Sequence, residues 1–195
     1  MTRTEHMKPA VLPSPLSSLI KDEALRSQPS HLPSLHSLAI QIQHNLQYQH
    51  EWSDLQIHTR SSFTNELLPR PLLSGLPPQR LYIHPDEQIE LLKDADRARK
   101  ARGEEEGGTL DVKAAPEREW ILPARLSEKW TLRRLAEVFD AIAVVPPQPE
   151  SEDMEEDRAA NPWRTTKRVI LATADTDSTV VYYIVQDGMV KPRQN

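Results

Sequence analysis

A tyrosine and a histidine lie two residues apart at Tyr82 and His84, inside a short apolar segment. Residues with this spacing on a β-strand point to the same face, so the pair could hold a phosphate or begin acid–base chemistry. No third group lies at a recognisable catalytic spacing, and strand residues often have this arrangement without any function. The pair is therefore a candidate site for a small nuclease, with ordinary strand residues as the alternative.

The other residues that could do chemistry are sparse. The seven histidines lie at positions 6, 31, 36, 44, 50, 58 and 84, so nothing after His84 can be a histidine base or ligand. His36, His44 and His50 lie eight and six residues apart, unlike the i, i+4 pair that binds zinc. There is no cysteine, which excludes disulfides, thiolate zinc sites and thiol nucleophiles. We expect no metal, no cofactor and no catalytic residue.

The composition predicts one domain with flexible additions. Seventeen prolines, five glycines and 37% hydrophobic residues in a chain of 195 indicate a sizeable share of linker. Two segments, 103–117 and 144–161, contain eleven acidic residues and only two basic ones, Lys113 and Arg158. Outside these acidic linkers the chain has 22 basic and 18 acidic residues, although the whole chain has a net charge of −5. The remainder permits proximity to RNA but is far from a stand-alone nucleic-acid binder.

The sequence also lacks the patterns of membrane and secreted proteins. No run approaches the roughly 20 apolar residues that cross a bilayer, and the first residues do not follow the pattern of a signal peptide. We expect a soluble intracellular protein without a membrane span.

Hydrophobic periodicity predicts three helices and five or six strands around one mixed sheet. Residues 1–28 contain several prolines without a sustained period and are expected to form a flexible N-terminal arm, followed by a single domain over residues 29–195. The predicted helices begin at Ser34, Asp86 and Thr131, the last with threonine as N-cap. Strands are expected at residues 52–57, 80–84, 120–123, 169–173 and 179–186, whereas the four prolines of residues 67–78 indicate no element.

The last predicted strand is unusual because Val180, Val181, Tyr182, Tyr183, Ile184 and Val185 form an uninterrupted apolar run. A half-exposed strand would alternate, so both faces of this strand require cover. The cover could come from helices of the same chain around a central strand. Equally, a partner could provide it at a sheet edge, where another chain can add a strand.

A resemblance to a known family is carried by four segments in order: SLAIQIQHNLQYQHEWSDLQIHT, LPRPLLSGLPPQRLYIHPDEQIELL, REWILPARLSEKWTLRRLAEVFDAI and RVILATADTDSTVVYYIVQDGMVKPRQN. They resemble the smallest, non-catalytic subunit of the eukaryotic tRNA-splicing endonuclease. The resemblance covers most of residues 30–195 outside the acidic linkers. It implies the mixed α/β domain of the tRNA-intron endonucleases, with one helix-flanked mixed sheet and a C-terminal β-hairpin.

The resemblance also implies a role and partners. Such a subunit belongs to a heterotetramer that removes introns from precursor tRNA without a metal, and catalytic members use a Tyr, a His and a Lys in that order. Tyr182, Tyr183 and Lys191 are available here, but the C-terminal half has no histidine, so no triad can form. The C-terminal strand, Val180–Val185, would pair with a catalytic subunit. The turn with Asp175 and Asp177 would dock in a basic groove of the opposite heterodimer, although turn chemistry alone could explain both acids.

We therefore expect a structural subunit with little RNA contact of its own, which is linked to precursor tRNA indirectly through its complex, in the nucleus or on an organelle surface facing the cytoplasm. The isolated chain could pair with itself. An interaction scaffold in another RNA-processing complex is the first alternative, and the small nuclease is the second.

Overall fold

A computed structural model describes residues 13–26, 31–101, 114–148 and 161–189. Within these ranges the chain forms four helices and five strands, in the order α1 (Pro15–Arg26), α2 (Pro33–Gln49), β1 (Ser53–Arg60), β2 (Leu67–Leu76), α3 (Pro85–Ala101), β3 (Glu119–Arg125), α4 (Leu132–Ala141), β4 (Arg168–Ala174) and β5 (Val180–Gln186). In this part of the chain no helix has the length and apolar character needed to cross a membrane. The predicted mixed α/β class is confirmed.

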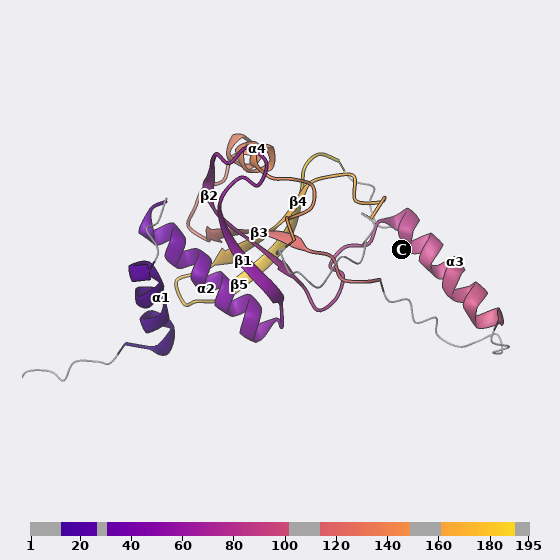
Figure 1. Cartoon of the computed structure of the whole chain (residues 1–195), viewed down its shortest axis with the longest axis horizontal. Helices are drawn as coiled ribbons and strands as arrows, with labels where there is room; N and C mark the ends of the chain where they lie inside the picture. The colour runs from indigo at the N-terminus through magenta and orange to yellow at the C-terminus, as the bar shows by residue number, and fades with distance from the viewer. Residues whose placement is uncertain (1–12, 27–30, 102–113, 149–160, 190–195) are drawn as a thin grey trace, which may run out of the picture.

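The five strands form one mixed sheet in the order β1-β2-β3-β4-β5 (Figure 1). β3 and β4 are parallel and are joined through α4, whereas the other neighbouring strands are antiparallel. β4 and β5 form the predicted C-terminal hairpin, paired in register from Arg168 with Gln186 to Ala174 with Val180. This order places β1 and β5 at the two edges of the sheet.

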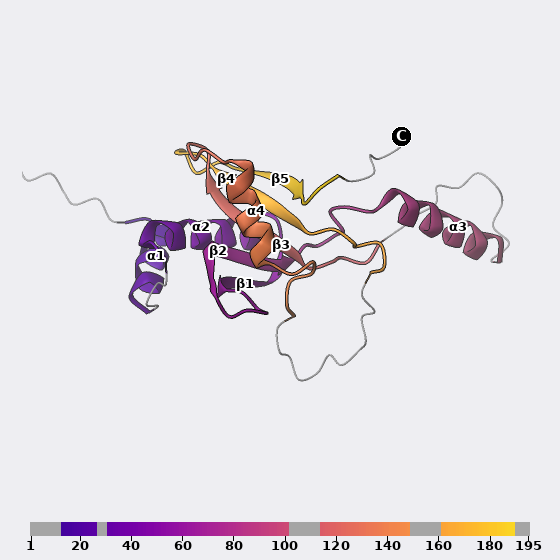
Figure 2. The same cartoon turned by 90° about the horizontal axis from the view of Figure 1, so that it is seen from above.

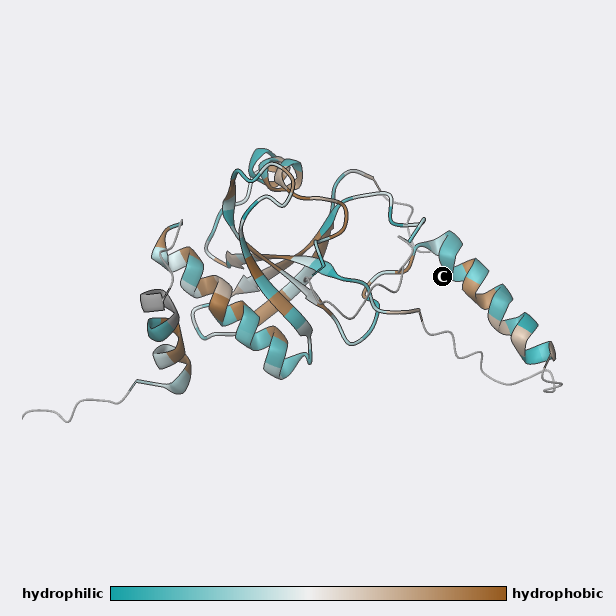
Figure 3. Cartoon of the chain, viewed as in Figure 1, coloured by the Kyte–Doolittle hydropathy of each residue, from teal (hydrophilic) through white to brown (hydrophobic). Residues whose placement is uncertain are grey.

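The sheet is covered by a helix on each face (Figure 2). α2 packs its apolar stripe, which includes Leu38, Ile42 and Leu46, against one face. Hydrophobic and hydrophilic residues alternate along this helix, as Figure 3 shows. On the opposite face Val138 and Phe139 of α4 belong to a second buried cluster. Both helices thus pack their apolar faces against the sheet, as their 3.6-residue periodicity predicts.

The termini of the helices also follow the predicted signals. α2 begins at Pro33, where the missing amide hydrogen has no cost. Thr131 caps α4, because its Oγ1 accepts a hydrogen bond from the amide of Arg134 at 3.3 Å. The acidic Asp86 lies in the first turn of α3 and the basic Lys100 in its last turn, both favourable to the helix dipole.

Two predictions about the N-terminal half are wrong. Residues 67–78 do contain a strand, β2, whose Pro69 and Pro71 lie between Leu67 and Leu72, the residues that pair with Arg60 and His58 of β1. That stretch is a bulge, and pairing with β3 covers only residues 73–75, so neither proline has to donate to a ladder. The second error is the strand predicted at residues 80–84, which is an irregular segment.

The predicted flexible N-terminal arm also differs from the structure where the two can be compared. Pro15–Arg26 forms helix α1, which lies beside α2 (Figure 1). Ser14 caps this helix, because its hydroxyl oxygen accepts a hydrogen bond from the amide of Ser17 at 3.2 Å. Residues 1–12, at the start of the predicted arm, lie outside the described residues.

Candidate partner-binding surface

The outer edge of β5 is the sheet edge that the sequence predicts to bind a partner. Among the described residues β5 pairs with β4 only, so alternate N–H and C=O groups of β5 point away from the sheet. An unpaired strand edge of this kind is a template onto which another chain can add a strand.

The exposure of the β5 side chains shows whether helices of the same chain cover both faces of this strand or leave them open to a partner. Val180 and Tyr182 pack against the α2-side core, and Val185 packs against the α4-side cluster. Three apolar side chains nevertheless stay exposed, with exposed fractions of 45% for Val181, 57% for Tyr183 and 43% for Ile184. The strand is therefore not a central strand buried by its own chain, and both of its faces carry uncovered apolar surface.

β5 is held rigidly on its inner side by helix α2. The Tyr182 hydroxyl donates a short hydrogen bond to the Asn45 side-chain carbonyl. The rings of Tyr182 and His50 also form a T-shaped contact, with centroids 5.1 Å apart. Burial raises the pKa of the Tyr182 hydroxyl above its ordinary value, so the group stays protonated and remains a donor. The edge that β5 offers is thus preformed.

The acidic turn between β4 and β5 uses both of its aspartates in local hydrogen bonds. The Asp175 carboxylate accepts from the amide of Thr176 at 2.6 Å, and the Asp177 carboxylate accepts from the amide of Thr179 at 2.9 Å. The bond from Thr179 lowers the pKa of Asp177, so its negative charge persists at neutral pH. Turn chemistry accounts for this geometry, and both carboxylates remain on the exposed surface. Docking of the turn stays a prediction.

Tyr82 and His84, the candidate nuclease pair, do not share a strand face. The guanidinium of Arg168 lies over the Tyr82 ring at 5.4 Å, and the Tyr82 hydroxyl is buried without a partner among the described residues. His84 stacks on Trp163 with ring centroids 5.5 Å apart, and its Nδ1 accepts from the amide of Asp86. Each side chain has a packing role of its own, so the two do not form a common site.

A buried charge cluster beneath Tyr82 was not predicted from the sequence. The Glu119 side chain is 1% exposed and accepts hydrogen bonds from Arg164 at 3.0 Å and from Arg168 at 3.1 Å. Glu117 accepts from Arg168 at 2.8 Å and from Asn161 at 2.6 Å. Isolated charged residues usually indicate a surface, and the sequence carries no signal that these four would be buried together.

This cluster corrects the boundary of the first acidic linker. Glu117 is its last predicted residue, yet its side chain is largely buried and also contacts Arg80 at 3.2 Å. Burial opposes its ionisation, but the hydrogen bond from Asn161 and the neighbouring Arg80 and Arg168 hold the pKa of Glu117 below its usual range. The cluster ties together segments on either side of both linkers and has a structural role. Most of the linkers, 102–113 and 149–160, lies outside the described residues.

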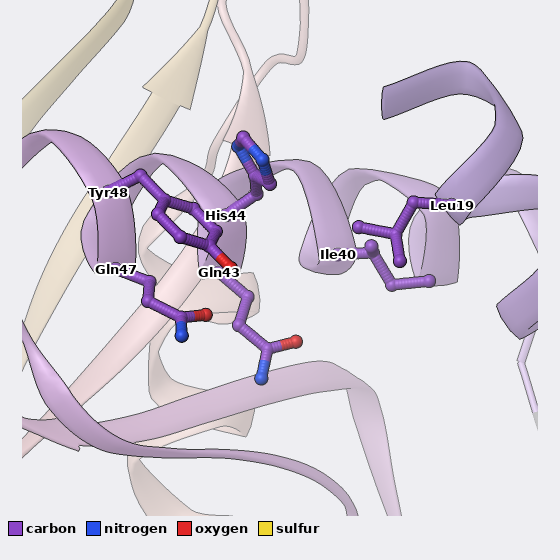
Figure 4. Close-up of a pocket in the computed structure, with 6 residues that line it drawn as sticks. All are labelled: Leu19, Ile40, Gln43, His44, Gln47 and Tyr48. Atoms are coloured by element: carbon purple, nitrogen blue, oxygen red, sulfur yellow. The ribbon is translucent and has the colours of Figure 1, made fainter. Parts of the chain in front are cut away.

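A small surface pocket lies between α1 and α2 (Figure 4). Its volume of about 210 Å³ is below the roughly 300–1,000 Å³ typical of small-molecule sites. The rings of His44 and Tyr48 on its wall contact each other at 4.6 Å, and Gln43 donates to the carbonyl of Leu55. No buried titratable pair faces this pocket in the described structure, so it does not resemble a catalytic centre.

Comparison with known proteins gives two matches. The model of the family described as Sen15 protein matches residues 41–195, which include all five strands and begin within α2. A protein of Neurospora crassa, described as "Probable tRNA-splicing endonuclease subunit tsp-1", is 44% identical over 172 residues. That alignment covers 87% of this chain and 69% of the Neurospora protein.

Proposed function

The chain belongs to the Sen15 protein family and is a subunit of a tRNA-splicing endonuclease, and we propose that its role in that complex is structural and not catalytic. It would position a catalytic subunit on precursor tRNA and support the removal of introns. In this role the chain provides a rigid edge for a neighbour and no reacting group.

The exposed edge of β5 carries this proposal. Val181, Tyr183 and Ile184 remain uncovered, and the strand is fixed on its inner side by Asn45 and Tyr182. A strand of a catalytic subunit that pairs along β5 would satisfy the outer backbone groups and cover both apolar faces. Interfaces built in this way combine main-chain hydrogen bonds with the burial of alternate side chains.

The absence of one residue of the catalytic triad supports a non-catalytic role. The family's catalytic subunits are expected to use a Tyr, a His and a Lys, with the last two in the C-terminal half, and this chain has no histidine after His84. The Tyr182 hydroxyl is bound to Asn45, and Lys191 lies outside the described residues. Without a histidine in the C-terminal half the triad cannot be assembled.

The turn with Asp175 and Asp177 is the proposed second contact. Both carboxylates are exposed, and the turn extends from the end of the hairpin that β5 closes. We place its partner on the opposite heterodimer of a four-chain complex, where a basic groove would receive it. We also propose that the complex acts in the nucleus, with a cytoplasmic organelle surface as the alternative.

Two other functions remain as alternatives. A scaffold in a different RNA-processing complex would use the same edge of β5 with other partners. A stand-alone nuclease would need Tyr82 and His84 to act together, which their separate contacts with Arg168 and Trp163 do not favour. In isolation the β5 edge could pair with a second copy of the chain, giving a homodimer.

Copurification tests the proposal. A tagged full-length chain would be isolated at its native level and its partners identified by mass spectrometry. Endonuclease subunits should dominate, and the complex should cut intron-containing tRNA while the purified chain alone does not. If other RNA-processing proteins dominate, the scaffold is correct. Cleavage by the isolated chain that a Tyr82→Ala, His84→Ala variant abolishes would support the nuclease.

A further inference from the structure

A group of basic side chains surrounds the loop between β3 and α4, on the face of the sheet that α4 covers. Arg125 ends β3, Lys129 lies in the loop, and Arg133 and Arg134 lie in the first turn of α4; all four are exposed. We call these four residues the α4 basic cluster. The chain as a whole has a net charge of −5, so this concentration of positive charge runs against the overall composition.

The acidic residue within the same segment is already neutralised. Glu128 accepts two hydrogen bonds from Arg70, at 2.7 and 3.3 Å, in a bidentate pair. Arg133 contacts Glu137 at 3.3 Å, but both side chains are largely exposed, and such pairs contribute little. Arg125 and Lys129 make no ion pair with any described residue. The cluster therefore keeps most of its charge for an external ligand.

Trp130 gives the cluster a preorganised shape. The guanidinium of Arg134 lies over the indole ring at 4.5 Å, and that of Arg70 lies at 5.1 Å from the same ring. Arg134 is further fixed because its Nη1 donates to the carbonyl of Lys129 at 2.8 Å. An arginine held in this way loses less entropy when it binds a phosphate or stacks on a base.

The surroundings restrict how a ligand can lie. The amide of Leu126 donates to the carbonyl of Ala174 at 2.9 Å, which brings the acidic turn with Asp175 and Asp177 beside the β3 end of the loop. The turn would repel a polyanion that extended past Arg125, whereas the N-terminal dipole of α4 adds a partial positive charge on the other side of the loop.

We propose that the α4 basic cluster binds the phosphate backbone of single-stranded RNA, with an unpaired base stacked on Arg134. The inference rests on the proposed function, since it gives the subunit a direct contact with the RNA of its complex. Phosphate contacts from Arg125, Lys129 and Arg133 would supply affinity independent of sequence. The exposed Leu126 and Leu132 beside the cluster would also suit a protein partner, so the test must separate these two ligands.

The test measures binding of the purified full-length chain to a fluorescent single-stranded RNA by anisotropy, at several salt concentrations. The triple variant Arg125→Glu, Lys129→Glu, Arg133→Glu should bind at least about tenfold more weakly at 0.1 M salt. Its plot of log affinity against log salt should be shallower by roughly two units, because about 0.7 is lost for each of three contacts. Arg134→Lys should weaken binding without changing the salt slope, since it keeps the charge but loses the flat stacking surface.

A matched triple variant on α3, Lys93→Glu, Arg97→Glu, Lys100→Glu, changes the net charge by the same amount on another exposed surface. It should keep its RNA affinity within about twofold if the effect is local. Circular dichroism melting would verify that both triple variants are folded. Equal losses in the two triple variants, no loss in the cluster variant, or no binding by the parent at about 0.05 M salt would each overturn the proposal.

Copurification of the same variants separates this proposal from the function on which it rests. A cluster variant that keeps RNA affinity but loses its partner subunits would show that the surface docks a protein, which also overturns the proposal. If the parent chain fails to copurify with endonuclease subunits, the proposed function falls, while the RNA measurement still decides the role of the cluster.

Discussion

At the scale of single residues, Glu119 shows how strongly one buried charge can be tied to the fold. Its carboxylate sits between the guanidinium groups of Arg164 and Arg168, and all three side chains are almost fully buried. A buried ion pair adds little over a well-packed apolar replacement, but removing one partner leaves the other charge without compensation. The cluster therefore matters through what its disruption would cost.

We predict that Glu119→Gln lowers the free energy of unfolding by about 3 kcal/mol, because two buried guanidinium groups lose their most buried counter-charge and keep only Glu117. Urea unfolding followed by circular dichroism would measure the change. Glu137→Gln is the matched control, since Glu137 pairs with Arg133 on the exposed side of α4 and should change stability by about 0.5 kcal/mol or less. A loss at Glu119 no larger than in this control would contradict the prediction.

His58 offers a second residue-scale test through its protonation. Its Nε2 lies 2.8 Å from the Ser74 hydroxyl, and its ring meets the edge of Trp120 at 5.0 Å. Burial, assisted by the positive charge of Arg118, lowers the pKa of His58 from 6.5 to about 4. The folded protein therefore keeps this imidazole neutral over a range in which the unfolded chain protonates it.

The pKa of His58 is depressed in the folded state, so the unfolded chain binds the proton more readily. The contribution of His58 to the free energy of unfolding should therefore be fully present above pH 6.5 and should be lost as the pH falls toward about 4. Because the ring is only partly buried, we expect a loss of about 1–2 kcal/mol from this residue. His58→Gln removes the titrating group and keeps an amide that can bond Ser74. Urea unfolding between pH 7 and 4.5 should show a steeper decline for the parent, and parallel profiles would count against the assignment.

At the scale of elements, the sequence predicts best where an element has a clear periodicity. The stripe of Leu38, Ile42 and Leu46 predicts α2 correctly, and Thr131 marks the start of α4. The missed strand in the middle of the chain has a physical cause. Pro69 and Pro71 conceal β2, because the sequence does not reveal that they fall in a bulge where no ladder donor is needed.

The candidate surface was predicted only in part, for a related reason. The apolar run from Val180 to Val185 correctly indicates a strand that needs cover on both faces. The position of that strand in the sheet depends on contacts between segments far apart in the chain, which local periodicity does not contain. The buried partners of Glu119 are hidden for the same reason. The single domain over residues 29–195 and the solvated character of the acidic linkers stay predictions.

The strand β5 itself allows a direct comparison of two neighbouring positions. Tyr183 is mainly exposed, whereas Val185 packs against the α4-side cluster, although both lie on the same face of the strand. We predict that Tyr183→Asp keeps the melting temperature within a few degrees but abolishes copurification with a catalytic subunit, because it places a charge in the paired edge. Val185→Asp should instead destabilise the isolated chain by about 1–3 kcal/mol, since it would place an unpaired carboxylate at a partly buried position against the α4-side cluster.

Thermal melting and copurification of the two variants would check this pair of outcomes. The serine variant Tyr183→Ser provides a control for loss of the ring without an added charge, and it should retain part of the binding. A Tyr183→Asp variant that copurifies as well as the parent would mean that the partner does not use this edge.

At the scale of the whole molecule, the edge of β5 runs along the side of the hairpin and the acidic turn forms its tip, so the two can serve different neighbours. β5 presents main-chain groups and apolar side chains, which suit a permanent strand-to-strand contact. The turn presents two carboxylates and little apolar surface, which suits a salt-sensitive contact with a basic groove. If the two contacts have these different roles, the complex would assemble as two halves that then join. Mutations in the β5 edge and in the acidic turn should then affect different assembly steps.

We therefore predict that changing Asp175 and Asp177 together to lysine blocks the joining of the two halves while β5 still pairs with its immediate partner. Charge reversal replaces attraction by like-charge repulsion, which can cost several kcal/mol across an interface. Both carboxylates also accept turn hydrogen bonds from the amides of Thr176 and Thr179, so lysine also removes these local bonds. The double asparagine variant controls for this, because its side-chain carbonyls keep the turn bonds and only the charge is lost.

Size-exclusion chromatography at low and moderate salt should show full-size complex for the parent, a salt-sensitive reduction for the asparagine pair and half-complexes for the lysine pair. Normal assembly of the lysine pair at moderate salt would identify Asp175 and Asp177 as turn residues alone, and the hairpin would then contribute one interface instead of two.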